Sequence, residues 1–306
     1  MRFISVAITL CLLAVSCSQK PEDIAKVEPK NIRESTFTIA ILPEQNVFEQ
    51  KKRYKPLAEY LSKSLNMNVK IKLLDSYGSI YDEIKNKTID GAFFGSFNYV
   101  LTKARADIEP VARAMETNGN SKYKGIIFTR KDTGLTADVK TWKDKRIALV
   151  HEVTTAGYVF PAWYLKKHGV VSFDSYFSRL IFSGSHDAAI LSVFKGQADI
   201  GAAKDLILQK MLSENPAIKN DIVILASSVA VPSNSLCLRS GMDSKTKESL
   251  KKSLLSMHHN ADGKTALQAL NASKFVETAD SEFDALRQMA KDIGIDIKSY
   301  PFRGNR

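Results

Sequence analysis

The sequence is poor in cysteine, with three among 306 residues. Cys11 lies in an apolar leader and Cys17 at its end, so Cys237 would be the one cysteine left to the folded chain. No internal disulfide can then form, and an exported domain without disulfides needs a large core. The 271 residues from Thr36 to Arg306 are enough for two lobes.

Short catalytic and metal-binding signatures are also missing. There is no HExxH, CxxC or GxxxxGK[ST] pattern in the chain. Ser183, Ser185, His186 and Asp187 are neighbours in sequence, but adjacency is not the geometry of a catalytic triad. We therefore expect a protein that is not an enzyme and that holds no metal and no cofactor.

The charge is one-sided, because 44 lysine and arginine residues face 33 acidic residues and give a formal net charge of +11. This excess favours an anionic partner or surface. No run of basic residues interleaved with aromatics is present, so we expect no nucleic-acid partner.

Residues 1–16 are predicted to be a signal peptide. A short basic start precedes an apolar stretch that ends at Val15 and is too short to span a bilayer. The small residues before Cys17 resemble the lipobox of bacterial lipoproteins, although Ala14 stands where that motif usually has leucine. We expect Cys17 to carry lipid; an ordinary cleaved signal with a chance cysteine is the alternative.

Residues 17–35 contain few large apolar side chains and cannot bury a core. Their four basic and four acidic residues balance, so the net charge belongs almost entirely to the folded part. We predict a flexible, lipid-anchored tether. It would hold the protein on the periplasmic side of a bacterial membrane or on the outer cell surface.

From residue 36 onward, short apolar runs alternate with amphipathic helices. This alternation predicts an α/β fold with a mixed, mostly parallel sheet in each lobe. The expected strands are 36–42, 69–74, 90–95, 108–115, 124–130, 146–150, 180–182, 199–203 and 221–226. The expected helices are 54–65, 79–86, 98–106, 156–168, 187–194 and 206–212, and residues from 244 on are expected to be mostly helical.

Two stretches share one rhythm, Lys85–Ala92 (KNKTIDGA) and Lys195–Ala202 (KGQADIGA). In each, a helix ends, a turn follows and an aspartate opens a short strand, which predicts two similar lobes. Residues 36–118 and 232–306 would form lobe I and residues 119–231 lobe II. The chain would cross between them near residues 117–123 and 228–234, with a cleft between the lobes.

Hydroxyl and small residues stand where predicted strands meet helices. Thr154 or Thr155 can cap a helix, and Ala156 and Gly157 after them leave the first N–H groups open. Helix N-termini carry unpaired donors and partial positive charge, so they hold anions. Most capped helices bind nothing, however, so this feature alone is weak.

The same kind of junction recurs twice. Ser96 lies between a strand and a helix, and His186 lies in the glycine- and serine-rich junction that starts at Ser183. In open α/β sheets, ligands bind beyond the carboxyl ends of strands. Three such junctions could converge on one ligand with several oxygens.

Together these segments resemble the phosphonate-, phosphite- and phosphate-binding proteins of ABC importers, from about residue 37 to residue 295. The similar stretches follow the family's order: Tyr77 before a helix, Ile89–Ser96 (IDGAFFGS), Tyr123–Asp132 (YKGIIFTRKD), Val153–Gly157 (VTTAG) with Pro161, Ser183–Ala189 (SGSHDAA), Gln197–Ala202 (QADIGA) and Val231–Asn234 (VPSN) with Arg239.

The resemblance implies a two-lobed type II periplasmic-binding-protein fold that closes on its ligand. It implies that the phosphoryl oxygens are held by Thr154, Thr155 and His186, with the N–H groups of Ala156 and Gly157. It also implies that Tyr77 and Tyr123 line the cleft. The partners would be a small oxyanion and an ABC permease, and the binding protein would act as a monomer.

The chain departs from relatives that capture aminoalkyl phosphonates. Asn234 stands where those relatives place an acid for the amine, Asp205 lies close to the other acidic position, and Ala156 replaces a common hydroxyl. A buried ammonium without a carboxylate is costly. We therefore expect a ligand without an amine, such as phosphate, phosphite or methylphosphonate.

Two other functions use the same fold. A sensory lipoprotein would bind the same ligand and pass a signal to a receptor, and no sequence feature separates that role from transport. A pyrimidine or a thiamine-like ligand would need aromatic stacking residues, for which Phe93, Phe94 and Phe97 are candidates, although core packing suits at least two of them.

Overall fold

The computed structural model describes residues 36–302, with the side chains of residues 216 and 217 left out. The predicted signal peptide, lipidated Cys17 and tether lie outside the described residues. Within the described part, no helix combines the length and apolar character that a membrane span requires.

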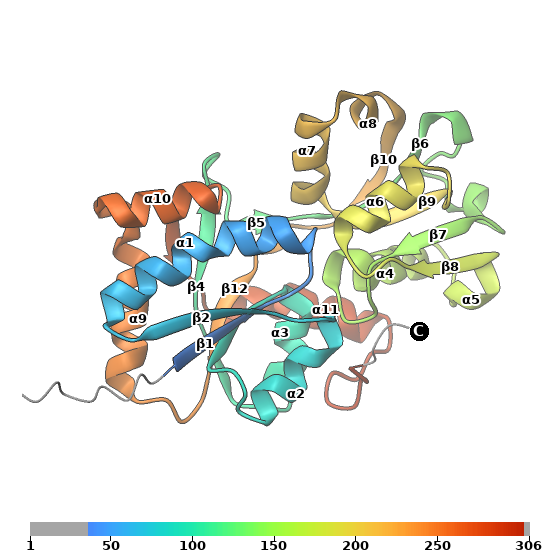
Figure 1. Cartoon of the computed structure of the whole chain (residues 1–306). Coiled ribbons are helices and arrows are strands. Elements are labelled where there is room, and N and C mark those ends of the chain that lie inside the picture. The colour runs from blue at the N-terminus through green and yellow to red at the C-terminus, as the bar shows by residue number, and fades with distance from the viewer. Residues whose placement is uncertain (1–35, 303–306) are drawn as a thin grey trace, which may run out of the picture. The chain divides into compact units, whose positions relative to one another are not determined.

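The first sheet has six strands in the order β13-β4-β12-β3-β1-β2 (Figure 1). Its strands are β1 (Thr36–Ile41), β2 (Asn68–Leu73), β3 (Gly91–Phe94), β4 (Ile108–Glu116), β12 (Ser235–Arg239) and β13 (Ala272–Glu277). Its helices are α1 (Val47–Leu65), α2 (Ile80–Lys85) after the short turn η1 (Tyr77–Ser79), α3 (Ser96–Lys103), α9 (Ser244–Ser256), the turn η5 (Met257–His259) and α10 (Ala261–Ala269).

The second sheet has five strands in the order β10-β6-β9-β7-β8. These strands are β6 (Gly125–Arg130), β7 (Arg146–Leu149), β8 (Arg179–Phe182), β9 (Ile200–Lys204) and β10 (Ile222–Ser227). The helical segments between them are η2 (Lys131–Thr133), η3 (Val139–Trp142), η4 (Thr155–Val159), α4 (Phe160–Lys167), α5 (Phe173–Tyr176), α6 (His186–Phe194), α7 (Asp205–Glu214) and α8 (Pro216–Asp221).

Two short strands connect the sheets. β5 (Lys122–Tyr123) and β11 (Val231–Pro232) pair antiparallel, so the two chain crossings run side by side. They coincide with the crossings expected near residues 117–123 and 228–234. Strands of the first sheet come from residues before β5 and after β11, which agrees with the proposed lobes; the boundaries themselves stay a prediction.

The expectation of mixed, mostly parallel sheets is confirmed, because β1, β2, β3 and β4 run in one direction in the first sheet and β7, β8, β9 and β10 in one direction in the second. In the first sheet, β1 pairs parallel with β2 and β3, but β12 pairs antiparallel with β3 and β4, and β13 antiparallel with β4. In the second sheet β6 runs antiparallel to both β9 and β10. β6 and β12 run against their neighbours because each enters a sheet directly from a crossing, without a helix that would return the chain to a parallel start.

The C-terminal part also contains a strand, β13, that the sequence pattern does not predict. β13 pairs with β4 and carries Phe275 into the core, and η6 (Asp280–Phe283) and α11 (Asp284–Asp292) follow it. The sequence of β13 is ASKFVE, which is short and half polar, so its pattern gave no clear period.

The first sheet is buried on both faces. Successive side chains of β1 point to opposite faces, and each face is covered by helices. Ile39 and Ile41 pack with α1, α9 and α10, whereas Ala40 and Leu42 face α2, α3 and α11. Figure 1 shows α1 and α2 on opposite sides of β1 and β2. The hydrophobic cluster that contains Ala40 and Leu42 continues without a break into the core of the second sheet.

Arg113 fastens the C-terminal segment to the first sheet. Its guanidinium is buried in β4 and donates to both carboxylate oxygens of Glu282 at 2.7 Å, to Thr278 Oγ1 at 3.1 Å and to the Ser121 carbonyl at 3.0 Å. Burial alone would raise the pKa of Glu282, but the hydrogen bonds from Arg113 lower it. A two-pronged pair of this kind is among the stronger ion pairs in proteins.

We predict that Glu282→Ala lowers the free energy of unfolding by about 2 kcal/mol, because it leaves a buried guanidinium without its anion. Urea denaturation measures this change. The control is Glu109→Ala, which removes a more exposed ion pair to Lys247 and should cost at most about 1 kcal/mol. Equal costs for the two variants would show that the Arg113 pair does not anchor this segment.

Candidate functional site

A small cavity lies where strand ends and helix starts of the two sheets meet. Its walls come from the loop after β1, from η1, from the β3–α3 junction, from β5, from the β7–η4 junction, from the start of α6 and from the end of β9. The lining residues are Glu44, Tyr77, Gly95, Phe97, Asn98, Tyr123, Val153, Thr154, Thr155, Ala156, His186 and Lys204. We call this space the inner cavity.

Two polar side chains at the inner cavity have no hydrogen-bond partner among the described residues. The Tyr77 hydroxyl and both amide atoms of Asn98 are unpaired, although the two residues are only 2% and 1% exposed. An unpaired buried polar group costs about 1–3 kcal/mol. Burial, with the nearby carboxyl of Glu44, raises the pKa of Tyr77, so its hydroxyl keeps its proton and can donate. Such groups in a cavity indicate a polar ligand.

His186 is a neutral donor at the start of α6. Its Nδ1 accepts a hydrogen bond from the Lys204 backbone N–H at 3.3 Å, so in the neutral ring the proton is on Nε2. Burial and then the charge of Lys204 hold the pKa of His186 well below its usual value. The imidazole can therefore offer an N–H to an anion without carrying charge.

The helix after β7 begins with a wide turn. Residues 155–159 form a π-helical turn, and the Val159 N–H bonds back to the Thr154 carbonyl at 3.1 Å. The N–H groups of Ala156 and Gly157 therefore have no acceptor within their own helix. The expected start of this helix at Ala156 is one residue late. The expected side-chain cap is wrong, because Thr154 Oγ1 donates instead to the His151 carbonyl at 2.7 Å.

Some predicted ligand hydroxyls already have protein partners. Thr155 Oγ1 accepts from the Phe97 backbone N–H at 3.0 Å, which joins the β7–η4 junction to α3, and Thr155 also hydrogen-bonds the Tyr123 side chain. Ser96 Oγ donates to the Pro232 carbonyl at 2.7 Å and does not line the inner cavity. Thr155 thus lies at the site and Ser96 beside it, holding β11 against α3.

Gly157 has a packing role, and the ligand role of its N–H stays a prediction. A Cβ atom at this position would lie 2.4 Å from Val150 Cβ and 2.8 Å from Thr154 Oγ1, and Gly157 does not line the inner cavity. Glycine is needed because the start of the helix packs closely against Val150, just after β7. At Gly95, which does line the cavity, a Cβ atom would have ordinary contacts, the nearest at 3.5 Å.

Asp205 lies outside the inner cavity, and its neighbour Lys204 takes the place in the wall. The Asp205 carboxylate accepts from the backbone N–H groups of Lys124 and Leu206 at 2.9 and 2.8 Å. Lys204 is buried, forms an ion pair with Glu44 and donates to Asn234 Oδ1 at 2.7 Å. Sequence reasoning missed Lys204, Glu44 and Asn98. The only signal was their position beside the predicted junctions.

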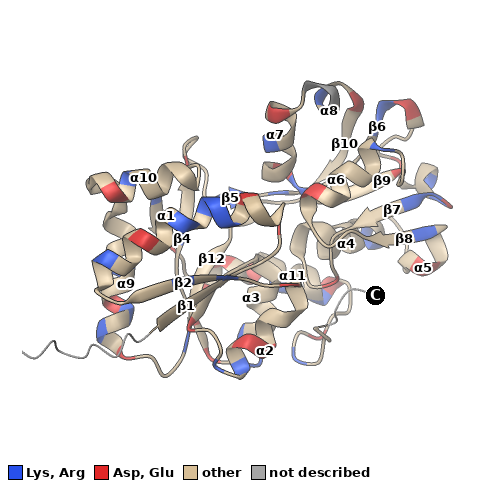
Figure 2. Ribbon diagram, in the orientation of Figure 1, with Lys and Arg blue, Asp and Glu red and all other residues tan. Residues whose placement is uncertain are grey.

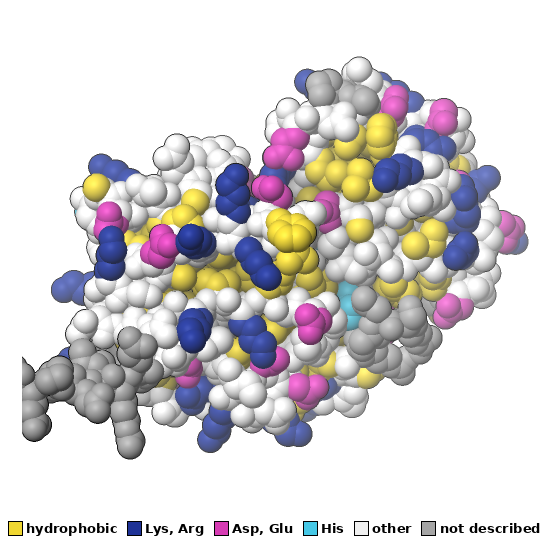
Figure 3. Space-filling view, in the orientation of Figure 1, with side chains coloured by type: hydrophobic (Ala, Val, Ile, Leu, Met, Phe, Trp, Pro, Cys, Tyr) yellow, Lys and Arg dark blue, Asp and Glu magenta, His cyan; other side chains and the backbone are white. Residues whose placement is uncertain are grey.

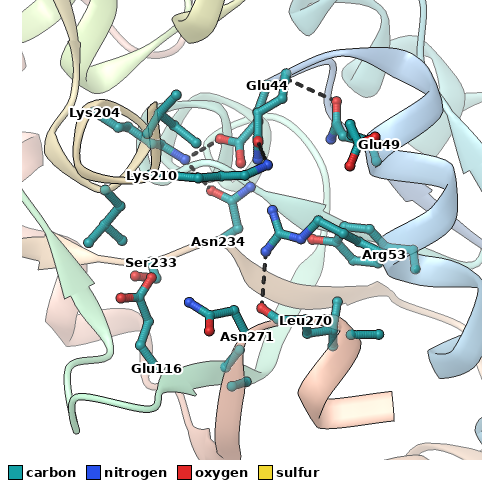
Figure 4. Close-up of a pocket in the computed structure, with 18 of the residues that line it drawn as sticks. Glu44, Glu49, Arg53, Glu116, Lys204, Lys210, Ser233, Asn234, Leu270 and Asn271 are labelled. Atoms are coloured by element: carbon teal, nitrogen blue, oxygen red, sulfur yellow. Dashed lines mark hydrogen bonds and ion pairs between the residues drawn. The ribbon is translucent and has the colours of Figure 1, made fainter. Parts of the chain in front are cut away.

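A larger groove opens on the other side of this ion pair. It has a volume of about 580 Å³ and is lined by residues of both sheets, so the expected cleft is present. Figure 4 shows Lys204 reaching Glu44 and Asn234 in its wall, with Lys210 and Arg53 nearby. Four basic and four acidic residues line the groove: Lys52, Arg53, Lys204, Lys210, Glu44, Glu49, Glu116 and Glu214.

Charge elsewhere on the described chain is dispersed. Basic and acidic residues are interspersed along the helices and strands (Figure 2), and the face in Figure 3 shows separate lysine and arginine side chains instead of one basic patch. The net charge of +11 therefore does not mark the site. In the same part of the chain, no cluster of three or more His, Cys, Asp or Glu residues could hold a metal ion.

The candidate stacking aromatics are largely used by the core. Phe93 packs between Tyr54 and Phe275, and Phe94 is fully buried in the cluster that joins the two sheets. Phe97 lines the inner cavity, but its ring packs edge-on against Tyr300 at 5.8 Å between centroids. Of these three phenylalanines, only Phe97 lines the inner cavity.

Comparison with known families gives one match over most of the chain. The sequence model described as "ABC transporter, phosphonate, periplasmic substrate-binding protein" matches residues 39–283. Among solved structures, PhnD1 from Prochlorococcus marinus in complex with methylphosphonate has a TM-score of 0.76 at 21% identity. That match covers 84% of this chain and 98% of that chain. A binding protein of a Pseudomonas aeruginosa phosphonate transporter gives a TM-score of 0.77 at 20% identity, covering 83% and 85%. The expected fold is confirmed.

Three curated relatives are similar at 20 to 27% identity. The phosphate-import protein PhnD of Mycolicibacterium smegmatis is 27% identical over 70% of this chain and 68% of its own length. A probable phosphite-binding PhnD1 of Prochlorococcus marinus is 22% identical, covering 83% of this chain and 89% of that protein. The phosphonates-binding periplasmic protein of Escherichia coli is 20% identical, covering 84% and 77%.

We predict that His186 makes stability fall in mild acid. Because its pKa in the folded chain lies below the usual value of about 6.5, the unfolded chain binds the extra proton first. The free energy of unfolding should therefore decrease as pH drops from about 6.5 toward the folded pKa, and His186 should add no pH dependence above that window. His186→Gln should flatten this part of the profile in urea denaturation.

His168→Gln, at an exposed position, is the control and should keep the wild-type profile. A wild-type profile in His186→Gln would contradict the assignment.

Proposed function

Because the chain belongs to the family of periplasmic substrate-binding proteins of phosphonate ABC transporters, we propose that it captures a small phosphorus oxyanion in the inner cavity. The candidates are phosphate, phosphite and a simple phosphonate, and the bound ligand is handed to an ABC permease. The observation that carries the proposal is the buried Tyr77 hydroxyl and Asn98 amide that lack partners among the described residues.

The chemistry of the cavity suits a tetrahedral anion. Donors approach from several directions: the Tyr77 hydroxyl, the His186 Nε2–H and the open N–H groups at the start of η4. Hydrogen bonds from neutral groups to an anion are strong in a dry site. The Asn98 amide can donate to an anionic oxygen or accept from a P–OH group.

We propose binding without catalysis. Ser185 Oγ accepts from the Ala188 N–H at 3.3 Å as a helix cap, and Asp187 accepts from the same N–H at 2.8 Å. His186 Nδ1 accepts a hydrogen bond from the Lys204 backbone N–H. The Ser185 hydroxyl donates to Asp187, and His186 Nδ1 accepts from a backbone N–H, so the three neighbours do not form a serine–histidine–aspartate relay.

Tyr77→Phe tests the proposed site with little structural disturbance, because it removes one oxygen that has no partner among the described residues. We expect unchanged or higher stability and an affinity for the preferred anion weakened by roughly 1–3 kcal/mol, about 5- to 150-fold. Titration calorimetry of the purified protein with phosphate, phosphite and methylphosphonate measures this.

The matched control is Tyr60→Phe, which removes a hydroxyl that donates to the Ser253 carbonyl at 2.9 Å, away from the cavity. It should lower stability by about 1 kcal/mol and leave affinity unchanged. Absence of binding for all three anions in the wild type would refute the proposed function. Binding with full affinity in Tyr77→Phe would refute the placement of the anion.

We also propose that Cys17 is acylated and holds the protein, as a monomer, on the membrane through residues 17–35. The support is the lipobox-like ending of the apolar leader and the polar stretch after it. Cys17→Ala in the full chain should move the protein from the membrane fraction to the soluble periplasmic fraction and abolish incorporation of labelled fatty acid. The control is Cys237→Ala, at a buried position in β12, which should keep both. Fatty-acid labelling that persists in Cys17→Ala would contradict the proposal.

A further inference from the structure

Two charged side chains, one acidic and one basic, line the inner cavity. Glu44 follows β1 of the first sheet, and Lys204 ends β9 of the second, so the two come from opposite sides of the site. Their side chains are 14% and 8% exposed and form an ion pair. Figure 4 shows this pair in the wall of the groove, and both residues also line the inner cavity.

Three side chains contact the ammonium group of Lys204. Its ammonium donates to the Glu44 carboxylate and to Asn234 Oδ1, and it lies 4.6 Å from the centre of the Tyr123 ring. An ammonium group has three hydrogens, and the two named partners take two of them. The third remains for an oxygen of a bound anion.

The Glu44 carboxylate beside the cavity would repel an anion if it were not paired with Lys204. An anion next to an unpaired buried carboxylate is strongly repelled, because charges interact strongly in a low-dielectric site. The ammonium of Lys204 neutralises Glu44 from within the protein. A ligand with an ammonium group of its own could neutralise Glu44 as well, but in this chain that place is taken.

We infer that Lys204 is a specificity-determining residue: its ammonium occupies Glu44 and Asn234, so that the site favours phosphorus oxyanions without an amine over aminoalkyl phosphonates. This inference rests on the proposed function. Asn234 then contributes to the preference for ligands without an amine because it accepts a hydrogen bond from Lys204, and not only because it lacks a charge.

The decisive experiment compares two ligands of nearly equal shape, 2-aminoethylphosphonate and propylphosphonate, which differ by an ammonium in place of a methyl group. Their ratio of affinities isolates the effect of the positive charge. In the wild type we expect 2-aminoethylphosphonate to bind no tighter than propylphosphonate in titration calorimetry at pH 8. Tighter binding of the amine by tenfold or more in the wild type would overturn the inference.

Lys204→Ala should reverse the preference. The change exposes Glu44 and vacates a space that the aminoethyl group can enter. The affinity ratio of 2-aminoethylphosphonate to propylphosphonate should rise by roughly tenfold to a hundredfold, the range for a hydrogen bond between charged groups. Binding of methylphosphonate should weaken by at least about tenfold. Lys204→Ser serves in the same way should the alanine variant fold poorly, and thermal melting establishes folding for each variant.

Two controls separate charge from space. Lys204→Met fills the vacated volume without charge, so it should lose methylphosphonate affinity and gain no preference for the amine. In the double variant Lys204→Ala with Glu44→Gln, the gain for 2-aminoethylphosphonate should disappear, because no carboxylate remains to meet the amine.

The outcomes distinguish this inference from the proposed function. If the wild type binds phosphate, phosphite or methylphosphonate and Lys204→Ala leaves the affinity ratio unchanged, the role of Lys204 is wrong while the proposed function stands. A ratio that rises equally in the double variant would also overturn the role, since room alone would then explain the gain. Absence of binding to all three anions in the wild type would refute the proposed function itself.

Discussion

The site is governed by the cost of burying a polar atom without a partner. Such an atom loses its water and regains nothing unless the protein or a ligand meets it. Most polar groups around the inner cavity obey this constraint within the protein: Ser96 bonds to Pro232, Thr154 to His151 and Thr155 to Phe97. Tyr77 and Asn98 are exceptions among the described residues. The fold therefore stabilises most of the site by itself and leaves a few donors for an anion.

Much of this arrangement could be predicted from local sequence. Short apolar runs such as Gly91–Phe94 and Ile200–Lys204 are followed by small or polar residues, and period and composition are enough to place a strand end and a helix start there. The carboxyl ends of parallel strands then meet at one edge of a sheet. Local patterns thus bring Thr154, Thr155 and His186 to one region, although they cannot say which hydroxyl is already paired.

What the sequence could not predict depends on contacts between distant residues. Glu44 and Lys204 are 160 positions apart, and each looks like an ordinary surface charge until the two sheets face each other. Gly157 looked like a place for a ligand to approach, but the need for glycine comes from Val150, whose side chain fills the same space. β13 was missed for a similar reason, since its pairing with β4 and not its own short pattern makes it a strand.

The distribution of charge explains how one site can hold an anion and still release it. Basic and acidic residues are interspersed along the described chain (Figure 2), and the groove beside the cavity has as many acidic as basic residues. Burial and Lys204 keep His186 neutral, and Glu44 balances Lys204, so the cavity walls are close to neutral overall. In the proposed site an anion would be held by oriented dipoles and one shared ammonium, whose hydrogen bonds would break when the segments that carry them separate. Those segments belong to both sheets, because Glu44 and Tyr77 come from the first and His186 and Lys204 from the second. Under the proposed function, affinity would therefore depend on the two sheets being close together, and moving them apart would release the ligand.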